Sequence, residues 1–223
     1  MGLPVLVYGK SGSGKSRSLK FFEEDEILLV NIEGKTLPFK KQFKYVLKTD
    51  STDTIISQLK KMPCKIGVLD DAGYLMTHHF MNNHRVKKGN ASFEMYDDIA
   101  DSMYFLVQNI KNELPDDVIV YIMFHEDTND AGDTKIKTIG KLLDSKVCME
   151  GMVTVCIRCM SDNGKHFFRT QTDGSDITKS PEDMFADVEI ENNLKFVDTT
   201  IRNFYGWSDK KTPNKEEKKN AKA

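Results

Sequence analysis

The stretch from Gly9 to Ser16 constrains this chain more than any other, because GKSGSGKS fits G-x-x-x-x-G-K-[ST] at every fixed position. An apolar run over residues 4–8 precedes it, as expected of a buried strand, and residues 16–22 can continue as a helix. Glycines let such a loop fold tightly, so that backbone N–H groups and the start of the helix face an anion. The pattern therefore predicts a phosphate-binding loop between a strand and a helix.

Two side chains of this loop have separate predicted roles. Lys15 is expected to reach the β- and γ-phosphates of a nucleotide, and Ser16 is expected to hold Mg²⁺. The residues predicted to contact the nucleotide are Gly9, Lys10, Ser11, Gly12, Ser13, Gly14, Lys15, Ser16 and Arg17. The alternative is a flexible turn rich in glycine and serine, which the flanking strand and helix argue against.

The size and charge of the chain narrow its class. It has 223 residues, enough for one large domain with a buried core, and a net charge of −2. This charge gives no global basic field, so contact with nucleic acid would depend on local patches. No apolar run approaches the roughly 20 residues that cross a membrane, and the N-terminus does not resemble a signal peptide. The four cysteines lack the spacing of a disulfide framework, which favours reduced thiols and a cytoplasmic protein.

Apolar runs and helical periodicity alternate along the chain. Buried strands are expected over 4–8, 27–32, 65–69 and 118–124, and helices over 51–62, 93–114 and 197–205. Asn163-Gly164 lies between two further extended runs, 152–160 and 165–172, and predicts a β-hairpin. This order predicts an α/β fold with a mainly parallel central sheet, helices on both faces and an antiparallel hairpin extension.

Two segments depart from this pattern. Residues 208–223 are rich in lysine and are expected to form a disordered tail after one domain over 1–207. Residues 77–92 are polar and locally basic, so we expect a mobile insertion there. Its basic residues lie near two phenylalanines, and such groups can follow a phosphate backbone and stack bases. The insertion is therefore a candidate contact for single-stranded DNA, with a solvated loop as the alternative. The residues in question are Arg85, Lys87 and Lys88, with Phe80 and Phe93.

Polar residues follow three of the predicted strands that come after the P-loop strand. Glu33 follows the second strand, Asp70 and Asp71 the third, and His125 the fourth. In open α/β sheets, ligands bind beyond the carboxyl ends of the parallel strands. We therefore expect these side chains and the P-loop to meet at one crevice.

Each of these side chains has a chemical role that its type allows. Asp70 resembles a Walker B acid, which holds Mg²⁺ directly or through water, and Asp71 could support the metal or orient water. Glu33 could polarise the attacking water, or it could lie solvated in the turn before Gly34. His125 could donate to the γ-phosphate, or it could be a hydrogen-bonded histidine at a strand end.

The Cys156-x-x-Cys159 pair is a weak signal for zinc. The sequence has no second cysteine pair of this kind to complete a four-ligand site. A separation of three along a strand also places the two thiols on opposite faces.

Four segments together resemble the RecA-like P-loop ATPases: Gly9–Ser16, residues 31–34, Ile66–Asp71 and Phe124-His125. The chain looks most similar to the small phage nucleotide-binding proteins of that class, some of which act in single-strand annealing and recombination. The resemblance covers roughly residues 3–185. It implies an enzyme that binds and hydrolyses ATP with Mg²⁺, with single-stranded DNA as a partner.

The same resemblance implies roles for single residues. The hydrolytic base falls on Glu33, the γ-phosphate sensor on His125, and a basic residue that reaches a neighbour's nucleotide on Lys179. A lysine that acts on a neighbour implies a head-to-tail homo-oligomer, a ring or a filament. The N-terminal oligomerisation segment and the DNA-binding loops of the larger recombinases have no match in this sequence.

Two other functions fit the P-loop. A small-molecule or nucleotide kinase would need an arginine-rich lid over its acceptor, whereas the five arginines of this chain do not cluster. A nucleotide-gated scaffold without turnover would need nucleotide binding alone.

Overall fold

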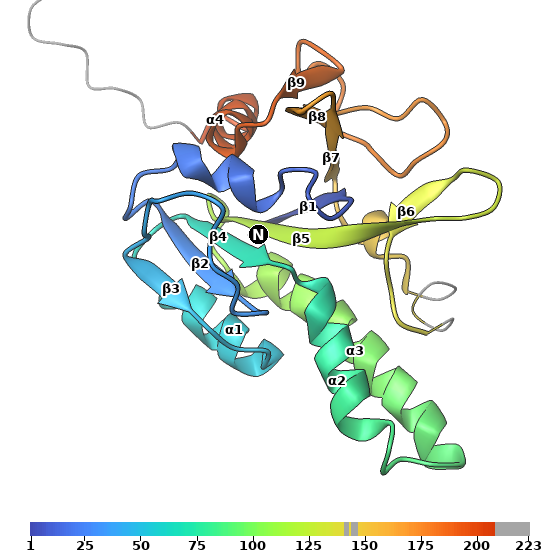
Figure 1. Cartoon of the computed structure of the whole chain (residues 1–223). Helices are drawn as coiled ribbons and strands as arrows, with labels where there is room; N and C mark the ends of the chain where they lie inside the picture. The colour runs from blue at the N-terminus through green and yellow to red at the C-terminus, as the bar shows by residue number, and fades with distance from the viewer. Residues whose placement is uncertain (141–142, 144–146, 208–223) are drawn as a thin grey trace, which may run out of the picture.

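The computed structural model describes residues 1–140, 143 and 147–207 (Figure 1). The predicted tail over 208–223 lies outside these residues. Within them, nine strands join one sheet in the order β3-β2-β4-β5-β1-β7-β8-β9, with β6 paired to β5. The strands are β1 (Leu3–Gly9), β2 (Ile27–Asn31), β3 (Tyr45–Leu47), β4 (Ile66–Asp70), β5 (Ile119–Thr128), β6 (Thr134–Ile136), β7 (Val155–Asp162), β8 (Lys165–Arg169) and β9 (Glu189–Glu191).

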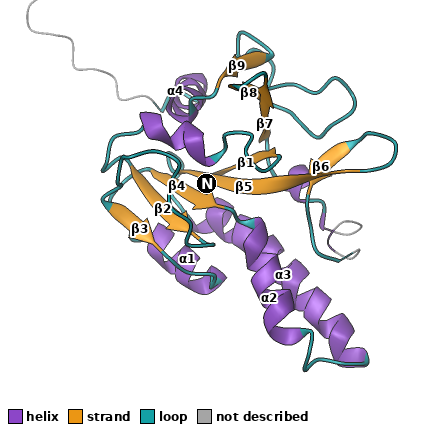
Figure 2. Ribbon diagram, in the orientation of Figure 1, coloured by secondary structure: helices purple, strands orange, loops and turns teal. Residues whose placement is uncertain are grey.

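The pairing directions confirm the predicted α/β class. Strands β3, β2, β4, β5, β1 and β7 pair in parallel, and β7, β8 and β9 continue the sheet in antiparallel fashion. The turn between β7 and β8 contains Asn163 and Gly164, both at positive φ, as the hairpin prediction required. The hairpin therefore extends one edge of a mainly parallel sheet (Figure 2).

Helices cover both faces of this sheet. Helices α1 (Thr52–Leu59), α2 (Gly73–Asn83) and α3 (Asn90–Glu113) pack on one face, and the 3-10 helix η1 (Ser16–Phe21) and α4 (Leu194–Phe204) pack on the other (Figure 1). Along β1, Leu6 and Tyr8 enter the first core, while Val5 and Val7 enter the second. Successive strand residues point to opposite faces, so a strand covered on both sides must be apolar throughout.

The segment predicted as a mobile insertion is mostly helical, so that prediction was wrong. Helix α2 runs to Asn83 and α3 begins at Asn90, and the two pack side by side and project beyond the sheet (Figure 1). Leu75 and Met76 of α2 are buried, and the ring of Phe80 lies 6.0 Å from that of Tyr96 on α3. The sequence shows no clear helical period here, because α2 buries only a few apolar residues along one narrow stripe and is polar elsewhere.

The strand register brings the polar strand ends together. Gly9 pairs with His125 across β1 and β5, and Asn31 pairs with Asp70 across β2 and β4. Strand β5 lies between β1 and β4, so the P-loop, His125 and Asp70 lie in a row at the carboxyl ends of these three strands. The crevice was predicted at this place, beyond the carboxyl ends of the strands.

Candidate functional site

The P-loop is a tight turn pressed against the β7–β8 hairpin. Gly12 has φ +77° and Gly14 has φ +108°, conformations that side chains other than glycine rarely adopt. A Cβ on Gly14 would lie only 2.9 Å from Nδ1 of His166, which in turn lies 2.7 Å from the carbonyl oxygen of Ser13. The glycines therefore serve both the turn and the close approach of a second part of the chain.

Lys15 lies buried over its own loop. Its ammonium donates to the carbonyl oxygens of Gly9 (2.7 Å) and Lys10 (2.9 Å) and lies 3.5 Å from Nδ1 of His125. Burial lowers the pKa of Lys15, and the thiol of Cys159 and the carboxylates of Asp71 and Asp70 act in the opposite direction. The loop therefore holds a cation at the point where the sequence predicts the phosphates.

Ser16 and Asp70 meet although 54 residues separate them. The Ser16 hydroxyl donates to Oδ1 of Asp70 at 3.0 Å, and Asp70 is almost fully buried at the end of β4. Burial and the neighbouring charge of Asp71 raise the pKa of Asp70 to about 6, while the Ser16 hydrogen bond opposes this shift. A carboxylate and a hydroxyl are hard oxygen donors of the kind that Mg²⁺ prefers.

This donor set fits Mg²⁺ better than a metal that needs a full protein cage. Mg²⁺ is usually bound by one or two carboxylates together with waters and substrate phosphates. Among the described residues, no group of three or more His, Cys, Asp or Glu side chains could hold a metal ion. Cys156 and Cys159 belong to the two opposite cores, so the expectation that their thiols face apart is confirmed.

Asp71 and His125 extend the site into a chain of contacts. Nε2 of His125 lies 3.2 Å from Oδ1 of Asp71, and the Lys35 ammonium lies 2.8 Å from Oδ2 of the same carboxylate. Because the Lys15 ammonium can only donate, His125 accepts at Nδ1 and donates from Nε2–H. Burial opposes ionisation of Asp71, but the hydrogen bonds from His125 and Lys35 outweigh it and lower the pKa of Asp71 to about 2.

These groups line one cavity of about 330 Å³. Its walls come from the P-loop, the ends of β4 and β5, the loop after β2, and β8. The lining residues are Ser11, Gly12, Gly14, Lys15, Ser16, Arg17, Lys35, Thr36, Pro38, Asp70, Asp71, His125 and His166. The arrangement can hold an anionic group between two lysines, beside a pair of oxygen donors for a divalent cation.

Not every predicted contact reaches this cavity. Gly9, Lys10 and Ser13 do not line it, and Lys10 and Ser13 instead face a smaller cavity against the β7 strand. Arg17 lines the cavity while its guanidinium donates to Oδ1 of Asn192 at 3.0 Å. The sequence predictions for Lys15, Ser16, Asp70, Asp71 and His125 thus agree with the structure in position, whereas their chemical roles stay predictions.

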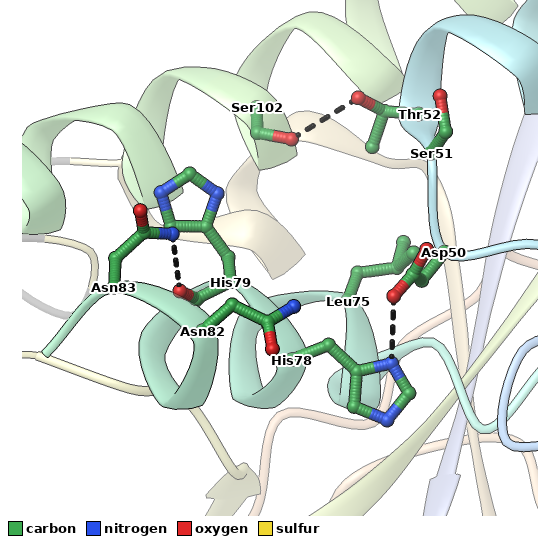
Figure 3. Close-up of a pocket in the computed structure, with 9 residues that line it drawn as sticks. All are labelled: Asp50, Ser51, Thr52, Leu75, His78, His79, Asn82, Asn83 and Ser102. Atoms are coloured by element: carbon green, nitrogen blue, oxygen red, sulfur yellow. Dashed lines mark hydrogen bonds and ion pairs between the residues drawn. The ribbon is translucent and has the colours of Figure 1, made fainter. Parts of the chain in front are cut away.

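Glu33 is turned away from the cavity. Its carboxylate lies 3.0 Å from Nε2 of His78, whose Nδ1 lies 3.1 Å from Oδ2 of Asp50. His78 and Asp50 line a separate polar cavity of about 260 Å³ between α1 and α2, and Figure 3 shows their contact. The strand-end position of Glu33 was predicted correctly, but its side chain does not face the crevice.

Lys179 does not line the cavity either. Its backbone N–H and carbonyl pair with the carbonyl and N–H of Cys156, both at 2.8 Å, on the strand next to the P-loop strand. The preceding Thr178 is buried, and its hydroxyl lies 2.7 Å from that of Tyr8. The structure therefore does not place Lys179 at its own chain's cavity, and a role at a neighbour's nucleotide stays a prediction, with an idle, solvated lysine as the alternative.

Four lining residues were missed by the sequence predictions: Lys35, Thr36, Pro38 and His166. Lys35 follows the second strand by four residues, so the strand-end rule that selected Glu33 could also have selected it. His166 gave no signal, because it reaches the loop only through the hairpin pairing.

Compared with known proteins, the chain matches no protein-family model and no curated protein sequence. None of the described helices is long and apolar enough to span a membrane.

Proposed function

We propose that this protein is a RecA-like ATPase that binds Mg²⁺–ATP at the P-loop cavity and hydrolyses it to ADP and phosphate. The observation that carries the proposal is the 3.0 Å contact between Ser16 and Asp70. It joins the last residue of the P-loop pattern to a buried carboxylate at the end of β4, which β5 separates from the P-loop strand β1. These two oxygen donors suit a divalent cation that also binds a triphosphate. A flexible turn rich in glycine and serine would not need a buried carboxylate beside its last serine.

Several residues at the cavity have a proposed part in this reaction. Lys15 neutralises the β- and γ-phosphates, and the loop glycines let backbone N–H groups approach them. Ser16 and Asp70 would hold Mg²⁺, which when bound spreads the negative charge of the phosphates. His125, which lies between Lys15 and Asp71, would sense the γ-phosphate.

Asp71 is the better candidate than Glu33 for positioning the attacking water. Its carboxylate lines the cavity, whereas that of Glu33 binds His78 outside it. Asp71 also has φ +60°, a conformation that aspartate tolerates better than most residues. We therefore assign the water-orienting role to Asp71.

The positions of the arginines favour hydrolysis of ATP over transfer of its γ-phosphate to a second substrate. Arg17 lines the cavity, while Arg158, Arg169 and Arg202 form ion pairs with carboxylates elsewhere. Arg85 is exposed at the turn between α2 and α3. Among the described residues no cluster of arginines faces the cavity, as a kinase lid would require.

The test is phosphate release from ATP, measured with Mg²⁺ and with excess chelator. Turnover that requires Mg²⁺ is expected, and Asp70→Asn should raise the Mg²⁺ concentration needed, because it removes a charge beside the ion. Transfer of phosphate from ATP to a nucleoside would instead support the kinase alternative. Tight binding of ATP without turnover would support the nucleotide-gated scaffold. If the folded protein binds no ATP in Mg²⁺, the proposal is wrong.

A partnership with single-stranded DNA is a second part of the proposal, and the projecting α2–α3 hairpin supports it. At its turn, Val86 and Phe93 are 77% and 73% exposed, beside the exposed Arg85 and Lys88. Lys87 is less available, because its ammonium pairs with Asp98 at 2.7 Å. Exposed cations beside an aromatic ring suit a phosphate backbone with unstacked bases.

The double variant Arg85→Ala, Lys88→Ala should therefore weaken binding of a fluorescent oligonucleotide. Each lost phosphate contact lowers the salt slope by about 0.7, so the pair should lower it by about 1.4. Lys48→Ala, Lys61→Ala is the matched control, since both of these lysines are exposed on the main body. An unchanged affinity and salt slope in the hairpin variant would remove this surface from the proposal.

A further inference from the structure

We propose that Lys35 is a further catalytic residue, which binds the γ-phosphate from within the same chain and so frees Asp71 to hold the attacking water. The inference rests on the proposed ATPase function and deepens it. It gives the cavity a second phosphate-binding cation that needs no neighbouring subunit. The predicted Lys179, in contrast, does not line its own chain's cavity.

The position of Lys35 is built by the residues around it. Gly34 has φ +72° and turns the chain directly after Glu33. The buried Asn31 at the end of β2 then donates from its side-chain amide to the carbonyl oxygen of Lys35 at 2.7 Å. The backbone of this lysine is thus fastened to the end of the strand that pairs with the Asp70 strand.

The Lys35 side chain reaches into the cavity but stays able to move. Its ammonium lies 2.8 Å from Oδ2 of Asp71 and 4.8 Å from the centre of the Tyr74 ring. The side chain is 54% exposed, so solvent surrounds much of its stem. A lysine on a fixed backbone with a half-exposed stem can shift its ammonium from one anion to another without refolding the loop.

The other cations near the cavity are more constrained. Lys15 is buried with its ammonium on the carbonyl oxygens of Gly9 and Lys10. The guanidinium of Arg17 donates to Asn192. Among the described lysines and arginines that line the cavity, Lys35 is therefore the one paired with a carboxylate, and the proposed reaction needs that carboxylate.

A chain of contacts places the two lysines on opposite sides of the same groups. Lys15 contacts His125, His125 contacts Asp71, and Asp71 contacts Lys35. A γ-phosphate that Lys15 binds would lie near this chain, and its charge would compete with Asp71 for the Lys35 ammonium. Two cations would then flank the phosphoryl group, where negative charge develops in the transition state.

The shift of Lys35 leaves Asp71 with a carboxylate oxygen to accept from water. In the reaction, a bond forms between the water oxygen and the γ-phosphorus, and the bond from that phosphorus to the β–γ bridging oxygen breaks. The bridging oxygen leaves with its electron pair as part of ADP. The proton of the water passes to Asp71 and then to solvent, so atoms and charges balance.

Lys35→Ala tests this directly, because ATP has the γ-phosphate and ADP lacks it. ATP affinity should fall about 10- to 100-fold, as for other lost charge-assisted contacts, while ADP affinity stays within about twofold. The rate of phosphate release at saturating ATP should also fall, about 100-fold or more. Lys35→Arg should keep part of the ATP affinity and part of the rate of phosphate release, because arginine is also a cation.

Lys44→Ala is the matched control, because Lys44 also lies over a tyrosine ring, at 5.3 Å from that of Tyr45, but outside the cavity. It should behave as the wild-type protein. Equal weakening of ATP and ADP, or no change in either, would overturn the role of Lys35 while leaving the ATPase proposal intact. Failure of the wild-type protein to bind ATP at all would instead overturn both.

Discussion

Lys15→Ala is expected to lower the affinity for ATP by about 100-fold or more, and to abolish ATP turnover as a result. The reason is that Lys15 is the buried cation of the loop, placed on the carbonyl oxygens of Gly9 and Lys10. The measurements are nucleotide binding by calorimetry and phosphate release. Lys20→Ala is the control, because Lys20 lies over the Phe21 ring on η1 and does not line the cavity.

The fold should survive this substitution. Loss of the ammonium removes a donor from the carbonyl oxygens of Gly9 and Lys10, although that of Lys10 still accepts from the Ser13 N–H at 3.1 Å. The expected cost is about 1–3 kcal/mol of unfolding free energy. That cost is smaller than the stability of an ordinary domain of this size, and urea unfolding would measure it. A well-folded Lys15→Ala protein that still hydrolyses ATP at the wild-type rate would show that the P-loop assignment is wrong.

Asp71→Asn is expected to slow hydrolysis about 100- to 10,000-fold with ATP binding retained, because an amide cannot take the proton of the water. Asparagine tolerates positive φ well, so the backbone at φ +60° should be kept. Glu33→Gln, in contrast, should change the rate only slightly, since Glu33 binds His78 outside the cavity. Single-turnover phosphate release separates binding from chemistry in both variants.

The pair of variants decides between the two carboxylates. Glutamine can still accept a hydrogen bond from His78, so Glu33→Gln is not expected to disturb the loop after β2. A slow Glu33→Gln enzyme together with a fast Asp71→Asn enzyme would reverse the assignment. That outcome would mean that Glu33 leaves His78 and enters the cavity during the reaction.

The sequence by itself determined the central strands, the hairpin, the helices α1, α3 and α4, and several residues of the candidate site. The P-loop pattern, the apolar strands and the hairpin at Asn163-Gly164 are local features, because glycine conformation and side-chain periodicity act over a few residues. The carboxyl ends of parallel strands lie together, so Asp70, Asp71 and His125 could be placed beside the P-loop from the sequence alone.

Only the tertiary structure decided where each side chain points and what it touches. Glu33 and Lys35 stand on either side of one glycine, yet the first binds His78 and the second binds Asp71. The helix α2 likewise depends on its packing against α3 rather than on its own weak periodicity. His166 meets Ser13 across 153 residues of sequence through the pairing of β7 and β8. Such contacts depend on strand register and loop path, and these are set by packing between distant segments that no local pattern records.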